Sequence, residues 1–244
     1  MLLRESRIMS DQFLEIENLN VSYGQSLILR DVCMTAKPGT ITAIMGSNGV
    51  GKTTLLKAIM GLLELDSGSI SLCGEDVTKS PTYTRTKKGL GYVPQGREIF
   101  PKLTVDENLI MGLEANQKKI KKIPNTLVYD LFPVLAKMGN RLGGNLSGGQ
   151  QQQLAISRAL VGYPKVLLLD EPTEGIQPSI IQDIEKVLIK LKNQGDMAII
   201  LVEQYLEFAQ RLADQYYIID RGSVVAEGEM DKLSKEDVTS YLTF

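Results

Sequence analysis

The sequence predicts an α/β fold in which a mainly parallel β-sheet is flanked by helices. Short apolar runs at 41–45, 166–169 and 197–202 have the length of buried strands. Segments with helical spacing separate these runs, and strands that alternate with helices form parallel sheets covered on both faces. A glycine-rich loop directly follows the first run and leads into a helix. A chain of 244 residues fits one such domain, or one domain with an additional lobe.

The N-terminal part predicts an antiparallel β addition to this core. Residues 13–23 and 26–36 are rich in strand-forming side chains, and Pro38-Gly39 ends the second segment. Residues 69–73 form a further short strand between two turn signals. Such short strands separated by turns are typical of antiparallel pairing.

The remaining elements are justified by their periodicity and their flanking turn residues. In chain order we expect a helix at 53–63, a brief strand at Tyr92-Val93, a polar helical region from 105 to about 137, helices at 150–160, 179–192 and 206–213, and a hairpin of 217–220 and 223–226 around Arg221-Gly222. No internal repeat or low-complexity tract interrupts this order.

The composition excludes several classes of protein. A net charge of −2 gives no basic face for nucleic acid, so we expect no nucleic-acid partner. No stretch approaches the roughly 20 apolar residues of a membrane span. Residues 1–10 are interpreted as a leader, with Met9 as an alternative start, because patterned sequence begins at Phe13.

Cysteine and histidine usage narrows the chemistry further. Cys33 and Cys73 are too few for a disulfide framework, and we expect two free, packed thiols in a reducing compartment. The chain contains no histidine. Zinc sites and histidine-based nucleophilic triads are therefore not expected.

A phosphate-binding loop is the first motif that carries chemistry. GSNGVGKT matches G-x-x-x-x-G-K-[ST] at each fixed position, and it stands between a predicted strand and a predicted helix. The glycines let backbone N–H groups turn toward phosphate oxygens, Lys52 reaches the β- and γ-phosphates, and Thr53 ligates Mg²⁺. The alternative is a plain connecting turn, which this context disfavours. The candidate nucleotide-binding residues are Gly46, Ser47, Asn48, Gly49, Val50, Gly51, Lys52, Thr53 and Thr54.

A pair of acids follows the apolar run at 166–169. Asp170 and Glu171 stand at the carboxyl end of a predicted buried strand, where ligands bind in open α/β sheets. Asp170 is expected to hold the Mg²⁺ shell and Glu171 to polarise the attacking water. Without the phosphate loop, a solvated acidic turn would be the simpler interpretation.

A second glycine turn, Leu146-Ser147-Gly148-Gly149-Gln150, leads into the helix at 150–160. It indicates either a second anion site at a helix N-terminus or an ordinary helix cap by Ser147. One γ-phosphate needs only one anion-binding glycine turn, so a second such turn indicates that the chain has another binding partner.

Together GSNGVGKT, LSGGQ and VLLLDEPT resemble the ATPase family of ABC transporters over nearly the whole chain. The resemblance implies an ATPase that uses ATP and Mg²⁺. It also implies a single domain over 1–244, with a P-loop NTPase core, the antiparallel β part, and a helical lobe at about 97–160 that carries the signature LSGGQ.

The resemblance assigns further roles. Two subunits meet head to tail, so that Ser147, Gly148, Gly149 and Gln150 cover the nucleotide of the partner. Tyr23 stacks on adenine, although a strand-end packing aromatic is the alternative. Gln95 links Mg²⁺ and water to the transport channel.

Two positions depart from the family pattern. Gln204 stands where a histidine is usual, and it can donate a hydrogen bond to a γ-phosphate but cannot become a cation near neutral pH. Gln177 stands where an aspartate usually precedes Pro178. We expect altered coupling between two ATP sites.

Three segments, PTEGIQPS, LVEQY and YVPQGREIFPKLTVDENL, are similar to the importers of branched-chain amino acids and of urea, most of all to the urea importer. This resemblance implies a peripheral subunit at the cytoplasmic face of the cell membrane. Its partners would be permease subunits, a second ABC ATPase in a heterodimer (or a homodimer in isolation) and, indirectly, a substrate-binding protein.

Two other classes share these motifs. DNA-repair ATPases carry a long coiled coil between the loop and the signature, and the roughly hundred residues here lack sustained heptads. Ribosome-associated ATPases carry two such domains in one chain. A lysine cluster, Lys118, Lys119, Lys121 and Lys122, is interpreted as a solvated face or as a contact to anionic lipid.

Overall fold

The structure, a computed structural model, describes residues 12–115, 120 and 122–241. The predicted leader with Met9 lies outside this part, as do Lys118, Lys119 and Lys121 of the lysine cluster.

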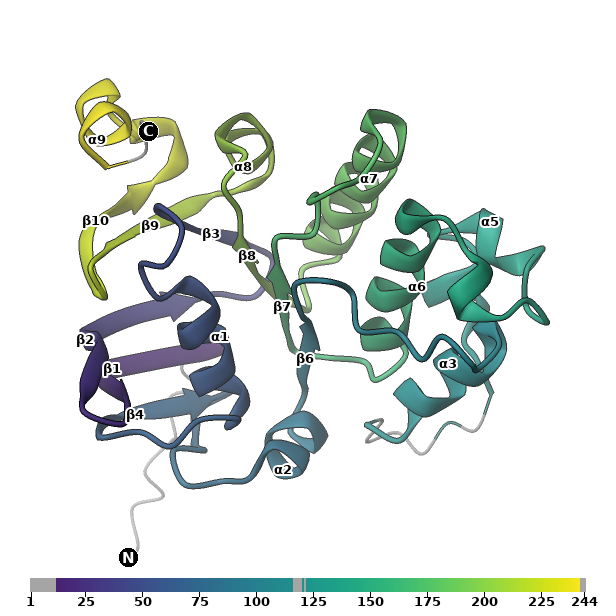
Figure 1. The fold of residues 1–244 in the computed structure, drawn as a ribbon, viewed down its shortest axis with the longest axis horizontal. Helices are drawn as coiled ribbons and strands as arrows, with labels where there is room; N and C mark the ends of the chain where they lie inside the picture. Colours follow the sequence, from purple (N-terminus) through teal and green to yellow (C-terminus); the bar gives the residue numbers. More distant parts are fainter. Residues whose placement is uncertain (1–11, 116–119, 121, 242–244) are drawn as a thin grey trace, which may run out of the picture.

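A six-stranded sheet forms the centre of the fold (Figure 1). Its order is β10 (Ser223–Glu229), β9 (Gln215–Asp220), β3 (Ile41–Met45), β8 (Ala198–Val202), β7 (Val166–Asp170) and β6 (Leu90–Val93). The neighbours from β9 to β6 are parallel, and only β10 pairs antiparallel within this sheet. Every residue of β3, β7 and β8 is buried, which confirms the predicted buried parallel strands.

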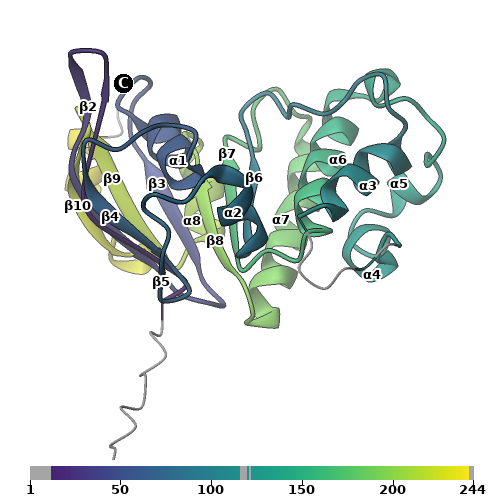
Figure 2. The ribbon, with the colours of Figure 1, turned by 90° about the horizontal axis from the view of Figure 1, so that it is seen from below.

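The N-terminal part of the chain also supplies a four-stranded antiparallel sheet, as predicted, with strands before and after β3 in sequence. This sheet consists of β2 (Ser26–Ala36), β1 (Leu14–Tyr23), β4 (Ser67–Leu72) and β5 (Glu75–Asp76). Helix α1 (Lys52–Met60) packs between this sheet and the parallel one, since Leu55, Leu56 and Ile59 share a buried cluster with residues of both. Figure 2 shows the antiparallel strands stacked beside α1.

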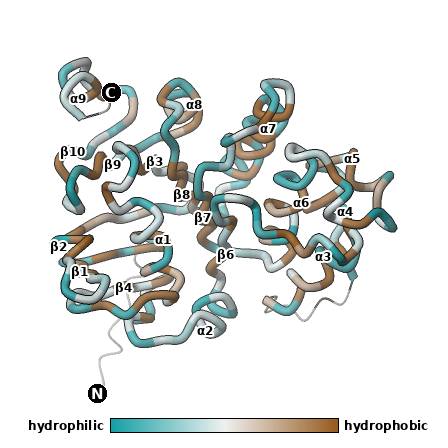
Figure 3. Tube along the Cα trace, in the orientation of Figure 1, coloured by the Kyte–Doolittle hydropathy of each residue, from teal (hydrophilic) through white to brown (hydrophobic). Residues whose placement is uncertain are grey.

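The other face of the parallel sheet is covered by α6 (Gly148–Leu160), α7 (Pro178–Gln194) and α8 (Leu206–Leu212). Successive residues of a strand point to opposite faces. Accordingly Leu167 and Leu169 belong to this helical layer, whereas Val166 and Leu168 face α1. The hydropathy colouring of Figure 3 shows the same concentration of apolar residues along the central strands.

The polar helical region from 105 to 137 is not one continuous helix. Its described part contains α3 (Val105–Leu113), α4 (Asn125–Val128) and α5 (Pro133–Ala136). Pro124 and Pro133 stand at the starts of the two short helices, where a missing backbone N–H is tolerated, and they prevent the chain from continuing as one helix. A 3₁₀ turn (Gly143–Asn145) then leads to α6.

Some other boundaries differ from the prediction. The helix predicted to reach residue 63 ends at Met60, because Gly61 adopts a left-handed conformation with φ 73°. Helix α2 (Thr82–Lys87), β5, a 3₁₀ turn (Met230–Lys232) and α9 (Lys235–Tyr241) were not predicted. The α2 sequence TYTRTK lacks an apolar stripe, so its periodicity gives no signal.

Within the described ranges, no helix combines the length and the apolar character needed to cross a bilayer. Cys33 and Cys73 are free, as expected, but both are exposed, so the expectation that they pack inside is wrong. Cys33 lies on an outward-facing position of β2, and Cys73 lies in the turn after β4.

Candidate nucleotide-binding and hydrolysis site

The phosphate-binding loop joins β3 to α1. Gly46, Gly49 and Gly51 have φ values of 145°, 81° and 113°, which side-chain-bearing residues rarely adopt. A Cβ at Gly46 would lie 2.2 Å from the carbonyl oxygen of Ile219, so this position also lacks space for one. Helix α1 starts at Lys52 without a side-chain cap, and its first N–H groups remain for a ligand.

Lys52 places its ammonium inside this loop. The residue is only 5% exposed, and Nζ donates hydrogen bonds of 2.8 Å to the carbonyl oxygens of Gly46 and Ser47. Burial lowers the pKa of Lys52, while the carboxylates of Glu171 and Asp170 act in the opposite direction. The loop therefore holds a cation where a phosphate group would bind.

Asp170, at the end of β7, is 1% exposed and faces the start of α1. The Thr53 hydroxyl donates to Oδ1 at 3.3 Å, and the Tyr92 hydroxyl donates to Oδ2 at 3.4 Å. Burial raises the pKa of Asp170, and burial beside Asp170 also raises the pKa of Tyr92. Tyr92 was not predicted as a site residue, because nothing in the sequence connects it with Asp170.

The oxygen atoms of Thr53 and Asp170 fit Mg²⁺, which prefers oxygen ligands. Among the described residues, no group of three or more His, Cys, Asp or Glu side chains is placed to hold a metal ion. Mg²⁺ is commonly held by one or two carboxylates together with substrate phosphates and water, so this sparse set suits it.

Glu171 lies in a second group of polar side chains. Its backbone adopts φ 48°, and its N–H donates to the Val202 carbonyl at 2.9 Å. The carboxylate accepts hydrogen bonds from Gln95 Nε2 at 3.0 Å and from Gln204 Nε2 at 2.8 Å. Gln204 Nε2 also donates to Oδ1 of Asn48 in the phosphate-binding loop. The structure thus brings Gln95, Gln204, Glu171 and Asn48 together around a cavity of about 350 Å³.

Three neighbours of this group were missed by the sequence analysis. Gln95 also donates to the carboxylate of Glu174 at 3.1 Å, and Arg97 donates to the Glu174 carbonyl at 3.3 Å. Glu203 is 3% exposed and bonds to Thr173. Its only sequence signal is an acid directly after a run of apolar residues.

The signature residues lie elsewhere. Ser147 caps α6 and forms a capping box with Gln150, so the helix-cap interpretation holds for its hydrogen bonds. Ser147, Gly148, Gly149 and Gln150 line a cavity of about 510 Å³ that also contains Gln177 at the start of α7. Among the described residues, this cavity shares no lining residue with the one at Glu171. Tyr23 is 47% exposed at the end of β1.

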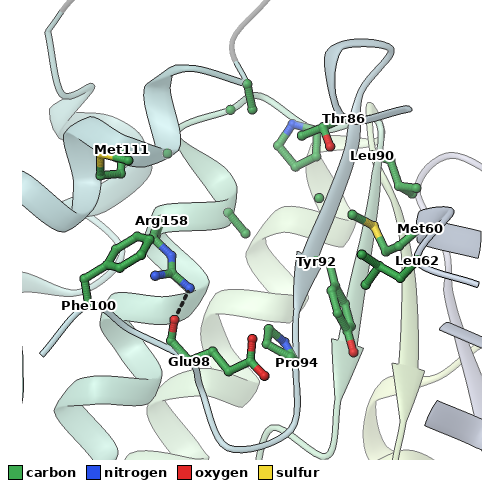
Figure 4. Close-up of a pocket in the computed structure, with 16 residues that line it drawn as sticks. Met60, Leu62, Thr86, Leu90, Tyr92, Pro94, Glu98, Phe100, Met111 and Arg158 are labelled. Atoms are coloured by element: carbon green, nitrogen blue, oxygen red, sulfur yellow. Dashed lines mark hydrogen bonds between the residues drawn. The ribbon is translucent and has the colours of Figure 1, made fainter. Parts of the chain in front are cut away.

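A further groove of about 450 Å³ lies where β6 meets α3 and α6 (Figure 4). Arg158 crosses it, donating through Nη2 to the Glu98 carbonyl at 2.8 Å and lying over the Phe100 ring with Cζ 5.1 Å from the ring centroid. Leu62, Phe100 and Met111 line this groove and are each more than 40% exposed.

Comparison with known proteins gives a consistent relationship. The profile of the ABC transporter family matches residues 29–174, more than half of the chain. The chain is 40% identical to the high-affinity branched-chain amino acid transport ATP-binding protein BraG of Pseudomonas aeruginosa, over 87% of this chain and 91% of that protein. It is 39% identical to the probable branched-chain amino acid transport ATP-binding protein LivF of Archaeoglobus fulgidus, over 90% and 93%.

Solved structures agree with this relationship. An ATP-binding subunit of an ABC transporter superimposes with a TM-score of 0.79 at 27% identity, covering 90% of both chains. A nucleotide-free ATP-binding cassette of an ABC transporter gives a TM-score of 0.77 at 28% identity, covering 95% of both chains.

Proposed function

We propose a function for this chain on the basis that it belongs to the ABC transporter ATPase family. The chain is an ATPase whose hydrolysis of ATP is coupled to transport. It acts as the ATP-binding subunit of an importer of branched-chain amino acids. The observation that carries the ATPase part of this proposal is the group of side chains that connects Glu171 and Gln204 with Asn48 of the phosphate-binding loop.

The cargo is inferred from likeness alone, since the ATPase subunit does not touch it. The sequence predicts urea first and branched-chain amino acids as the alternative. The two relatives named for branched-chain amino acid transport, alike over nearly their whole lengths, favour the alternative. Urea import is kept as an outcome of the test below.

Each part of the site has a role in hydrolysis. The loop from Gly46 to Thr54 holds the phosphates. When the nucleotide binds, the Lys52 ammonium donates hydrogen bonds to phosphate oxygens in place of the carbonyl oxygens of Gly46 and Ser47. Thr53, Asp170 and Gln95 would hold Mg²⁺, which neutralises charge on the phosphates when bound. Glu171 orients the attacking water, and Gln204 donates its amide to the γ-phosphate end of the nucleotide.

The separate cavity of the signature residues supports a two-subunit arrangement. Because Ser147 and Gly149 lie apart from the phosphate-binding loop of their own chain, they would cover the nucleotide of a second ABC ATPase subunit. Exposed Tyr23 would stack on adenine, and Gln177 would face the partner chain. The partner is a different ATPase in the cell, or a second copy in isolation.

The groove beside Phe100 and Arg158 supports contact with a membrane permease. Its exposed apolar side chains suit a short cytoplasmic helix of the permease. The chain would thus be bound peripherally at the cytoplasmic face of the cell membrane.

The test is uptake of labelled leucine and labelled urea in cells that carry the native chain, Glu171→Gln or Glu207→Gln. Glu207 is exposed on α8 and serves as the matched control. Glu171→Gln should abolish leucine uptake, and the purified variant should bind ATP but hydrolyse it about 100-fold or more slowly.

Loss of urea uptake alone would move the chain to the urea branch and leave the ATPase mechanism intact. Near-normal ATP turnover by Glu171→Gln would refute the role of Glu171. If both uptakes were unaffected despite lost ATPase activity, the importer assignment would be wrong.

A further inference from the structure

Glu203 is a buried carboxylate that the hydrolysis mechanism above does not use. It follows β8 directly, is 3% exposed, and is separated from solvent although the next residue, Gln204, is exposed. A buried charge is costly unless its oxygen atoms receive hydrogen bonds. The surroundings of Glu203 therefore indicate what it does.

Its two carboxylate oxygens face two different loops. Oε1 accepts hydrogen bonds from the Thr173 N–H at 3.1 Å and from the Thr173 hydroxyl at 2.7 Å. Oε2 accepts from the N–H of Gln204 at 3.2 Å and from the N–H of Tyr205 at 3.3 Å. Thr173 follows Glu171 in the loop after β7, whereas Gln204 and Tyr205 form the loop after β8.

We propose that Glu203 is a positioning residue for ATP hydrolysis, which holds the loop of Glu171 in register with the loop of Gln204. The 2.8 Å hydrogen bond from Gln204 Nε2 to Glu171 depends on this register. Only a carboxylate offers two acceptor oxygens, so an amide of the same shape satisfies one loop and not the other. The inference rests on the proposed roles of Glu171 and Gln204.

Steady-state kinetics of the full chain provide the first test. In Glu203→Gln an NH₂ group replaces one acceptor oxygen, which leaves either the Thr173 N–H or the N–H groups of Gln204 and Tyr205 without an acceptor. Because small misplacements of catalytic groups cost about 10- to 100-fold, kcat should fall by that factor. The KM for ATP should stay within about twofold, since the phosphate-binding loop is unchanged. A role confined to stability would lower the melting temperature and leave kcat of the folded fraction unchanged.

Three variants frame this result. Glu207→Gln, an exposed change on the adjacent helix, should leave kcat unaltered. Thr173→Val removes the hydroxyl donor to Oε1 and should lower kcat, and Thr173→Ser, which keeps it, should restore most of the loss relative to valine. Full activity of both Glu203→Gln and Thr173→Val would overturn the proposal.

Hydrogen exchange of the nucleotide-free chain tests the positioning role of Glu203 independently of ATP turnover. Glu203→Gln should speed exchange at the amides of the loop that faces the NH₂ group, either Thr173 or Gln204 and Tyr205, whereas Glu171→Gln should leave all three amides protected. Unchanged exchange at all three amides in Glu203→Gln would refute the positioning role. Normal turnover of Glu171→Gln would instead refute the proposed role of Glu171 in hydrolysis, and the exchange result would still test the role of Glu203.

Discussion

Asp170 and Glu171 are adjacent residues with opposite surroundings. Asp170 completes a buried strand, so its carboxylate points among Thr53 and Tyr92 and lies out of contact with solvent. Glu171 adopts a left-handed backbone conformation, which turns its carboxylate toward Gln95 and Gln204. Such a conformation costs about 1–3 kcal/mol and persists where neighbouring contacts enforce it. Two adjacent acids can therefore take two roles, one toward a metal ion and one toward water.

The raised pKa of Asp170 predicts a stability effect that depends on pH. A carboxyl group whose pKa is higher in the folded chain favours folding when protonated, so its contribution is present below about pH 3.9 and lost as the pH rises through its folded pKa. Asparagine stays neutral at every pH. Asp170→Asn should therefore raise the free energy of unfolding of the nucleotide-free chain at pH 7.5 by roughly 1 kcal/mol.

Urea denaturation at pH 7.5 and at successively lower pH measures this effect. The difference between Asp170→Asn and the native chain should shrink as the pH falls toward 4. Asp66, which is exposed, supplies the control Asp66→Asn, with a change below about 0.5 kcal/mol. A destabilised Asp170→Asn at pH 7.5 would mean that the carboxylate is better satisfied in the folded chain than its burial indicates.

Sequence spacing predicts the candidate site residues that belong to a local sequence pattern. Lys52 and Thr53 follow from the glycine loop, and Asp170 and Glu171 follow from an apolar strand that ends in two acids. Tyr92 and Glu203 could not be found in this way. Their roles depend on hydrogen bonds to residues 78 and 30 positions away, which exist only once the sheet has formed.

Among the elements, α1 depends on a residue from outside itself. Arg85 of α2 is 2% exposed, and its Nη1 donates to the carbonyl oxygens of Ala58 and Ile59 at 2.8 Å and 2.7 Å. Its remaining nitrogens donate to the carbonyls of Ser80 and Thr78. The last carbonyls of a helix lack partners within the helix, so Arg85 satisfies the C-terminal end of the element whose N-terminus faces the phosphate-binding loop.

Removing this arginine should therefore destabilise the chain. Arg85→Met removes the guanidinium donor from four carbonyl oxygens, of which Ala58 keeps the Gly61 N–H, and the free energy of unfolding should fall by about 3 kcal/mol. Lys87→Met on the exposed side of the same helix should change it by less than about 0.5 kcal/mol. Thermal and urea denaturation of both variants measure the difference. Equal stabilities would show that water replaces the guanidinium without cost.

The predictability of each element follows from its burial. The buried strands β3 and β7 and the edge strand β2 begin and end within one residue of their predicted ranges, because apolar or β-branched side chains mark them and turns bound them. Helix α2 went unpredicted, since its one buried residue is a charged arginine. Its position depends on contacts with α1, because its own sequence has no apolar periodicity that would predict a helix.

At the scale of the whole molecule, the parallel sheet brings together the candidate hydrolysis residues from segments far apart in sequence. Asp170 ends β7 and Glu171 follows it, Gln204 lies in the loop after β8, and the phosphate-binding loop follows β3, a neighbour of β8 in the sheet. Gln95 follows β6 at the edge. The loops at the carboxyl ends of adjacent parallel strands lie side by side, so these polar side chains come together at one edge of the sheet. Pro94, the residue directly after β6 and next to Gln95, lines the groove at Phe100. A partner that occupies this groove would thus be close in sequence to a residue that contacts Glu171.

This arrangement predicts that a charge in the groove separates the ATPase subunit from its membrane partner. Met111 lies on α3, lines the groove and is 49% exposed. Met111→Glu would bury a carboxylate against an apolar partner, at a cost of about 1–3 kcal/mol, and should lower both the membrane-bound fraction of the chain and leucine uptake about tenfold or more. Ile189→Glu, an equally drastic change at a 38% exposed position on α7, is the matched control. Equal effects of the two variants would place the membrane partner on another surface.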